Sequence, residues 1–128
     1  MHRTQLIPKY LLGYPLTGKL SQAAMLLYYH LWATTSEYCG CDIFNFSNFE
    51  GTLGMKIKKQ KKAILELQEA NLLYFDVSNC EYLLTLWFDL QRPEKLDIKL
   101  IKESFAKIES TQLQVEVQKH YSEYLKMI

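Results

Sequence analysis

The sequence predicts a single α+β domain, in which helices precede a small antiparallel sheet and more helix follows it. Apolar residues recur with helical spacing in three segments, near residues 21–34, 56–71 and 98–128. Between the second and third segments, two β-rich runs flank the polar pair Ser78-Asn79, as expected for a hairpin. A chain of 128 residues that is 48% hydrophobic can bury one core without disulfides.

The first third of the chain predicts an irregular arm followed by a helix. Proline and glycine interrupt residues 5–19, which we interpret as an N-terminal arm packed on the body. Ser21 is a favourable N-cap for a helix that runs to about Thr34. One stripe of this helix has the i, i+3, i+4, i+7 spacing of a buried face, and its residues are Ala24, Leu27, Tyr28 and Leu31.

A short strand and a short helix are expected next. Asp42–Phe46 is the strand candidate, and Ser47 with Glu50 fits a capping box that starts the helix. Gly54 is expected to end it.

A longer helix is predicted from Lys56 to Asn71, where Asn can adopt the left-handed conformation that ends helices. Its buried face is expected to contain Ile57, Ile64 and Leu67. The hairpin strands follow as residues 72–77 and 80–88. Apolar side chains alternate on both sides of the second strand, with Leu83 and Trp87 on one side, so each side should be covered.

Residues 93–128 predict a C-terminal helical extension to a domain of residues 1–92. Pro93 suits its first turn, and a break is expected near Ser110-Thr111. Two apolar stripes are offset from each other: Ile98, Ile101, Phe105 and Ile108, and then Val117, Tyr121, Tyr124 and Ile128. We interpret the spare stripe as a homodimer surface. The alternative is that the two helices pack on each other and on the sheet, which gives a monomer.

The order helix, short strand, short helix, glycine turn, basic helix and hairpin is that of a winged helix-turn-helix domain. Its third helix is basic, although the net charge of the chain is only +1. The predicted contacts with duplex DNA are Lys56, Lys58, Lys59, Gln60 and Lys62, with Lys61 and Lys19 as secondary candidates. Lysines that neutralise phosphates release condensed counterions, and an amide such as that of Gln60 can read adenine.

Each of these interpretations has a simpler alternative. The lysines can be an ordinary solvated helix face, and Gln60 can be a half-buried spacer. The hairpin carries Asp76 and Glu81 beside its turn and no Lys or Arg there. We therefore expect the hairpin to be structural and not to contact phosphate.

Other classes of function have little support in the sequence. Three cysteines, with Cys39 and Cys41 one residue apart, are expected to be free thiols. His2, His30 and His120 have no metal-ligand spacing, His30 is expected to be structural, and no catalytic motif occurs. We expect no enzyme activity, no cofactor, metal or small-molecule ligand, no membrane span, and a location in the bacterial cytoplasm.

Two stretches resemble a known family. Gln5–Leu11 with Lys19–Tyr28 resembles the opening of RepA_N-type plasmid replication initiators of Gram-positive bacteria. Leu53–Leu73 resembles their helix-turn-helix, a stretch that phage replisome organisers and DnaD-like N-terminal domains share. Lys56 and Gln60 depart from the family pattern, which has Ser or Thr and an apolar residue at these positions. The resemblance implies binding to an origin or operator.

The sequence therefore predicts sequence-specific binding to duplex DNA, in plasmid or phage replication initiation or its control. A small winged-helix transcriptional regulator is the alternative within the same class. A protein-interaction module built on the same scaffold is the alternative in another class.

Overall fold

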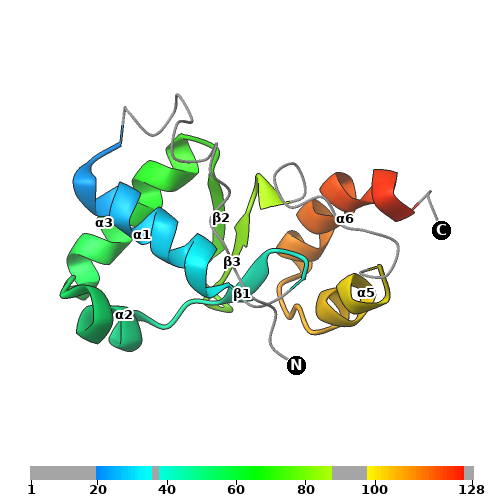
Figure 1. Cartoon of the computed structure of the whole chain (residues 1–128), viewed down its shortest axis with the longest axis horizontal. Coiled ribbons are helices and arrows are strands. Elements are labelled where there is room, and N and C mark those ends of the chain that lie inside the picture. The colour runs from blue at the N-terminus through cyan, green and yellow to red at the C-terminus, as the bar shows by residue number, and fades with distance from the viewer. Residues whose placement is uncertain (1–19, 36–37, 88–97, 126–128) are drawn as a thin grey trace.

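The computed structural model describes residues 20–35, 38–87 and 98–125, which form an α+β arrangement (Figure 1). Along the chain, the helices and strands have the order α1 (Gln22–Thr34), β1 (Cys41–Ile43), α2 (Phe46–Leu53), α3 (Ile57–Glu69), β2 (Leu73–Asp76), β3 (Glu81–Leu84), α5 (Ile98–Ala106) and α6 (Thr111–Leu125). The sheet lies between α1–α3 on one side and α5–α6 on the other. The predicted arm, Lys19, Pro93 and Ile128 lie outside the described residues.

Helix α1 forms as the sequence predicts. The side chain of Ser21 caps it by accepting a hydrogen bond of 3.1 Å from the backbone N–H of Ala24. The helix ends at Thr34, and all four residues of the predicted stripe are completely buried. Trp32 is completely buried as well, so α1 contributes two faces to the core.

Helix α2 begins earlier than predicted, and the capping box at Ser47 and Glu50 is wrong. Asn45 is the N-cap, and its side chain accepts a hydrogen bond of 3.0 Å from the N–H of Asn48. Asn caps as well as Ser does. The earlier start places Phe46 and Phe49 around Phe44, with ring centroids 4.7 and 4.6 Å from it, so aromatic packing selects the cap.

The ends of α2 and α3 follow the predictions. Gly54 ends α2 in the left-handed conformation, with φ of 63°. Asn71 follows α3 with φ of 60°. The buried stripe of α3 differs from the prediction, because it consists of Gln60, Ala63, Ile64 and Leu67. Ile57 lies at the edge of this stripe and is 39% exposed, so its predicted burial is wrong.

Strand β3 is the centre of the sheet, whose order is β1–β3–β2. It is shorter than the predicted run of residues 80–88 and ends at Leu84. Both faces are covered, as expected. The hydroxyl of Tyr82 lies 2.6 Å from Oγ1 of Thr35 at the end of α1, whereas the neighbouring Glu81 accepts a 2.7 Å hydrogen bond from the N–H of Ser110 before α6. Because successive side chains alternate across a strand, β3 joins the two helical layers.

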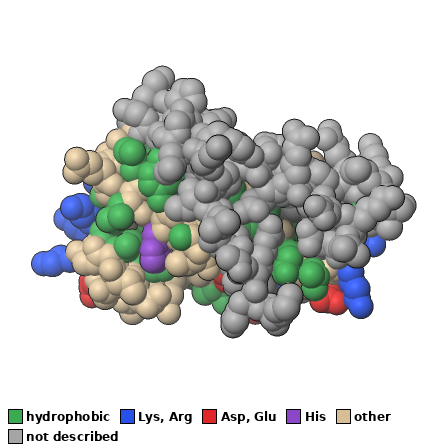
Figure 2. Space-filling view, in the orientation of Figure 1, with side chains coloured by type: hydrophobic (Ala, Val, Ile, Leu, Met, Phe, Trp, Pro, Cys, Tyr) green, Lys and Arg blue, Asp and Glu red, His purple; other side chains and the backbone are tan. Residues whose placement is uncertain are grey.

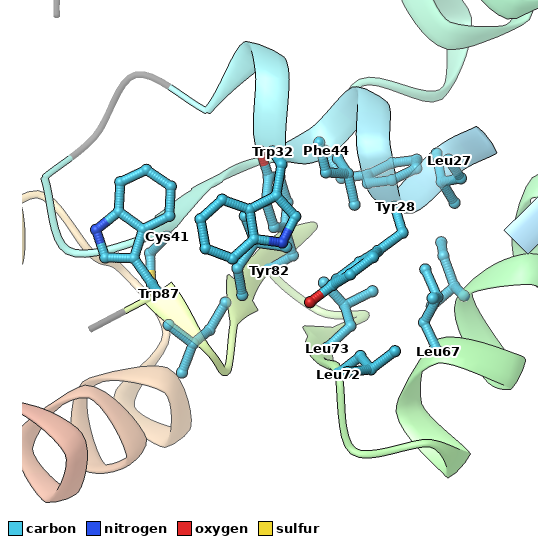
Figure 3. Close-up of a cluster of buried hydrophobic side chains, with 14 of the residues drawn as sticks. Leu27, Tyr28, Trp32, Cys41, Phe44, Leu67, Leu72, Leu73, Tyr82 and Trp87 are labelled. Atoms are coloured by element: carbon cyan, nitrogen blue, oxygen red, sulfur yellow. The ribbon is translucent and has the colours of Figure 1, made fainter. Parts of the chain in front are cut away.

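The two tryptophans form the core beside this strand (Figure 3). Trp87 follows β3 and stacks on Trp32 of α1, with ring centroids 5.1 Å apart and planes inclined by 20°. Its indole N–H donates a 2.8 Å hydrogen bond to the carbonyl of Tyr38. The prediction that Trp87 extends the strand beside Leu83 is therefore wrong. Gly40, with φ of +76°, is required beside it, because a Cβ there would lie 2.5 Å from Cγ of Trp87.

The C-terminal helices break where the sequence predicts. Helix α5 ends at Ala106, and Ser110 caps α6 by accepting a 3.2 Å hydrogen bond from the N–H of Leu113. Helix α6 packs against β2, β3 and α5.

This packing corrects the predicted dimer surface. Ile98, Ile101, Ile108 and Val117 are buried within the chain itself, and Phe105 is half-buried against the core. These residues are not an exposed interface, because both helices turn their apolar stripes towards the sheet and each other. The side chains of Tyr121 and Tyr124 lie outside the described part of the structure.

Truncating Trp87 tests the stacked core. We expect Trp87→Ala to lower the free energy of unfolding by about 3–5 kcal/mol, because a large cavity replaces a buried indole. Urea unfolding followed by circular dichroism measures the loss. Val115→Ala removes an apolar side chain that is 50% exposed on α6, and it should change stability by less than about 0.5 kcal/mol. Equal stability of the two variants would contradict the burial of Trp87.

Candidate nucleic-acid interface

The five lysines of α3 and its N-cap form an exposed cationic surface, which we call the lysine face: Lys56, Lys58, Lys59, Lys61 and Lys62. All five side chains are exposed, and the opposite side of the helix is buried against the core. Basic side chains, blue in Figure 2, project at both ends of the molecule, and one of these ends is where α2 and α3 lie in Figure 1. The structure therefore brings five of the predicted lysines together on one helix, whereas Lys19 lies outside the described residues.

The lysines point in three directions around the helix. Lys58 and Lys62 are four residues apart and lie opposite the buried stripe. Lys59 lies on the flank towards α1, where with Lys62 it lines a groove of about 440 Å³ beside the start of that helix. Lys61 lies on the other flank, beside the hairpin. The cationic surface consequently spans nearly half of the circumference of α3.

Glu66 fixes the orientation of this surface, a role that the sequence analysis missed. Its carboxylate accepts hydrogen bonds from the backbone N–H and the hydroxyl of Ser21, at 3.1 and 2.7 Å. An acidic group at this position also complements the positive end of the α1 dipole. The hydrogen bonds from Ser21 lower the pKa of Glu66, and nearby Lys62 contributes less. The same carboxylate therefore caps α1 and ties α3 to it.

Gln60 does not face outward, and the prediction that it reads a base is wrong. It is completely buried, and its amide nitrogen donates hydrogen bonds of 3.0 Å to the carbonyl of Phe46 and 2.8 Å to that of Met55. Phe46 is the first residue of α2, and Met55 lies directly before the N-cap of α3. Gln60 therefore sets the angle between the two helices, and its burial exceeds that of the half-buried spacer considered as the alternative.

The acidic residues of the hairpin bind the C-terminal segment. Asp76 accepts a hydrogen bond from the hydroxyl of Ser110, and Glu81 accepts bonds from the backbone N–H groups of Glu109 and Ser110 at 3.2 and 2.7 Å. Asp76 also holds the turn through the N–H of Ser78 at 2.9 Å. The hairpin has the structural role that the sequence analysis expected, and its acidic groups face α6.

Histidine and cysteine side chains form no site in the described part of the chain. Cys39, Cys41 and Cys80 are free thiols, as expected. Among the described residues, no cluster of three His, Cys, Asp or Glu side chains is arranged to hold a metal ion. His30 is half-buried and meets Phe49 edge-on at 5.1 Å, and burial lowers its pKa.

Within the same residues, no helix has the length and apolar character needed to cross a membrane. Comparison with protein-family models, curated proteins and solved structures finds no match. The fold and the site define a small α+β protein with an exposed cationic helix. The resemblance to plasmid initiators stays a prediction.

Replacing Gln60 tests its structural role. Gln60→Ala should lower the free energy of unfolding by about 1–3 kcal/mol, because two carbonyls lose a buried donor. Thermal unfolding measures this loss, and Lys61→Ala, the exposed neighbour, is the control that should stay within about 0.5 kcal/mol of the parent. A shift in DNA sequence preference in the folded Gln60→Ala protein, without loss of stability, would restore the base-reading role.

Replacing Ser110 tests the contact between the hairpin and α6. The hydroxyl of Ser110 is the main cause that lowers the pKa of Asp76 below its ordinary value of 3.8. The resulting stabilisation is present above the unfolded pKa and is lost as pH falls through the folded pKa. NMR titration of the Asp76 carboxyl should therefore show a higher pKa in Ser110→Ala. Ser78→Ala keeps its backbone donor and should leave the pKa of Asp76 unchanged; equal effects would contradict the contact.

Proposed function

We propose that this chain is a winged-helix protein that binds duplex DNA through the lysine face of α3. The observation that carries the proposal is the exposure of all five lysines on a helix whose opposite side is buried. No acidic residue occurs between Glu50 and Glu66, and the carboxylate of Glu66, four residues after Lys62, is already bonded to Ser21. An exposed cationic helix of this kind attracts phosphates and releases their counterions.

The arrangement of the lysines suits the major groove, which is about 12 Å wide and admits one α-helix. With α3 in the groove, Lys58 and Lys62 face its floor, while Lys59 and Lys61 on the two flanks face the phosphates of opposite strands. Lys56, at the N-cap, reaches the nearest phosphate at the entrance. The order α1, α2, α3 and hairpin is the winged-helix order, which supports this mode of binding.

The proposed complex depends on α3 more than on the hairpin. Since Gln60 is buried, lysine contacts with guanine O6 and N7 are the direct base readout left on this face. Asp76 and Glu81 of the hairpin are engaged by α6 and repel phosphate. We therefore propose few phosphate contacts, a correspondingly shallow salt dependence and recognition centred on guanine.

The resemblance in the sequence analysis suggests where such binding acts. We propose a role in plasmid or phage replication initiation or its control, in a bacterial cytoplasm. A nuclease footprint on the DNA of the element itself tests this role. Protection of repeats within an origin supports the initiator, and protection upstream of the protein's own gene supports the transcriptional regulator instead.

Neutralising the lysine face tests the proposed interface. Replacing Lys58, Lys59 and Lys62 with Ala should weaken DNA binding and reduce the slope of log K against log salt by about 0.9 for each lost phosphate contact. Fluorescence anisotropy with a labelled duplex at several salt concentrations measures both quantities. Folding should be preserved, because these side chains are exposed.

A matched variant separates the position of the charges from their number. Lys99, Lys102 and Lys119 are exposed on α5 and α6, and replacing all three with Ala removes the same net charge. This control should bind DNA with nearly the affinity and salt slope of the parent. If both triple variants lost affinity equally, binding would depend on net charge alone, and the α3 interface would be wrong.

A further inference from the structure

An apolar groove lies between α3 and the hairpin, and of its lining residues the proposed DNA contact uses only Lys61. We call it the hairpin groove; its volume is about 370 Å³, and its apolar lining consists of Phe46, Ile64, Leu65, Phe75, Val77 and Cys80. Lys61 and Gln68 complete the walls on the α3 side. A groove of this size has room for a small ligand or for several side chains of a docked peptide.

The groove is open and its walls are fixed. Leu65 is 58% exposed on α3 and Val77 is 82% exposed at the turn of the hairpin, although this chain buries most of its other large apolar residues. The side-chain oxygen of Gln68 accepts a 3.2 Å hydrogen bond from the N–H of Phe75, which ties α3 to β2 below the groove. Exposed apolar residues around a preformed hollow are typical of a protein-interaction site.

The charge of the residues that line the hairpin groove indicates which kind of segment binds there. Lys61 lies on the wall of the groove, four residues before Leu65 on the same side of α3, and among the described residues no acidic side chain lines the groove. Residues 1–19 contain Arg3, Lys9 and Lys19 and no acid, so the charge of this stretch does not complement that of Lys61. An occupant that complements this surface has apolar side chains for the floor and carboxylates for the rim.

We propose that the hairpin groove binds an acidic amphipathic helix of a partner protein. Apolar side chains at helical spacing enter the groove between Leu65 and Val77, and carboxylates beside them meet Lys61. Helices bind grooves in this way through anchors at i, i+3, i+4 and i+7. The site goes beyond DNA binding, since it uses the flank of α3 that faces away from Lys59.

Titration of the ¹⁵N-labelled full chain with a synthetic peptide tests the proposal. The probe is a helix of about 15 residues with leucines at i, i+3, i+4 and i+7 and glutamates on the remaining surface. We expect saturable chemical-shift changes centred on Leu65, Gln68, Phe75 and Val77. A peptide of the same composition, scrambled so that its leucines share no face, should bind at least about tenfold more weakly.

Two matched double variants complete the test. Leu65→Ser with Val77→Ser should weaken peptide binding by about tenfold or more and leave DNA affinity unchanged. Ile43→Ser with Val115→Ser removes two apolar side chains of similar exposure elsewhere, 69% and 50%, and should leave peptide binding unchanged. The Lys58, Lys59 and Lys62 variant tests the DNA interface separately, so each proposal can fail alone.

Three outcomes would overturn the proposal. The first is the absence of shifts at millimolar peptide, and the second is equal binding of the scrambled peptide, which would indicate only charge attraction. The third is a set of groove shifts that appears on raising the protein concentration without peptide, which would assign the groove to a second copy of the chain.

Discussion

Strand β3 carries a polar side chain on each of its two buried faces, and each side chain needs a hydrogen-bond partner. The arrangement of the helices depends on which residues supply these partners. All four of its residues are buried. Tyr82 meets Thr35 at the end of α1, and Glu81 accepts the N–H groups that precede α6. A buried carboxylate or phenol without such partners is costly, so the helical layers are held at the positions where these bonds form.

The same principle orients the helix that carries the candidate site. Three polar side chains on α3 each bond to a different neighbour: Gln60 to the carbonyls around α2, Glu66 to Ser21 at the start of α1, and Gln68 to β2. These bonds have defined directions, unlike apolar contacts, and they fix the rotation of α3 about its axis. The lysines face outward because the other sides of the helix are already bonded to the neighbouring elements through Gln60, Glu66 and Gln68.

One helix consequently presents two surfaces of different chemistry. Lys58, Lys59 and Lys62 form a surface suited to phosphate, whereas Leu65 and the hairpin form an apolar hollow with a cationic rim. A DNA contact and a protein contact on adjacent flanks of α3 would allow a bound duplex and a partner to influence each other. The C-terminal helices contribute to this arrangement because Ser110 engages Asp76 beside the hairpin turn.

Local sequence by itself determined the elements whose signals act within a few residues. Ser21 caps α1, Gly54 and Asn71 take the left-handed conformations that end α2 and α3, and the chain breaks at Ser110. The exposure of the α3 lysines also followed from local periodicity, because charged side chains are too costly to bury unpaired.

The tertiary structure decided the features that depend on contacts between segments distant in the sequence. Packing around Phe44 selects Asn45 over Ser47 as the cap, hydrogen bonds to the carbonyls of Phe46 and Met55 hold Gln60 inside, and Ile98, Ile101, Ile108 and Val117 of the predicted dimer stripes are buried within the chain. Spacing shows that a side chain can be buried, but only the assembled neighbours determine whether it is, because burial depends on area and polar partners that distant segments supply.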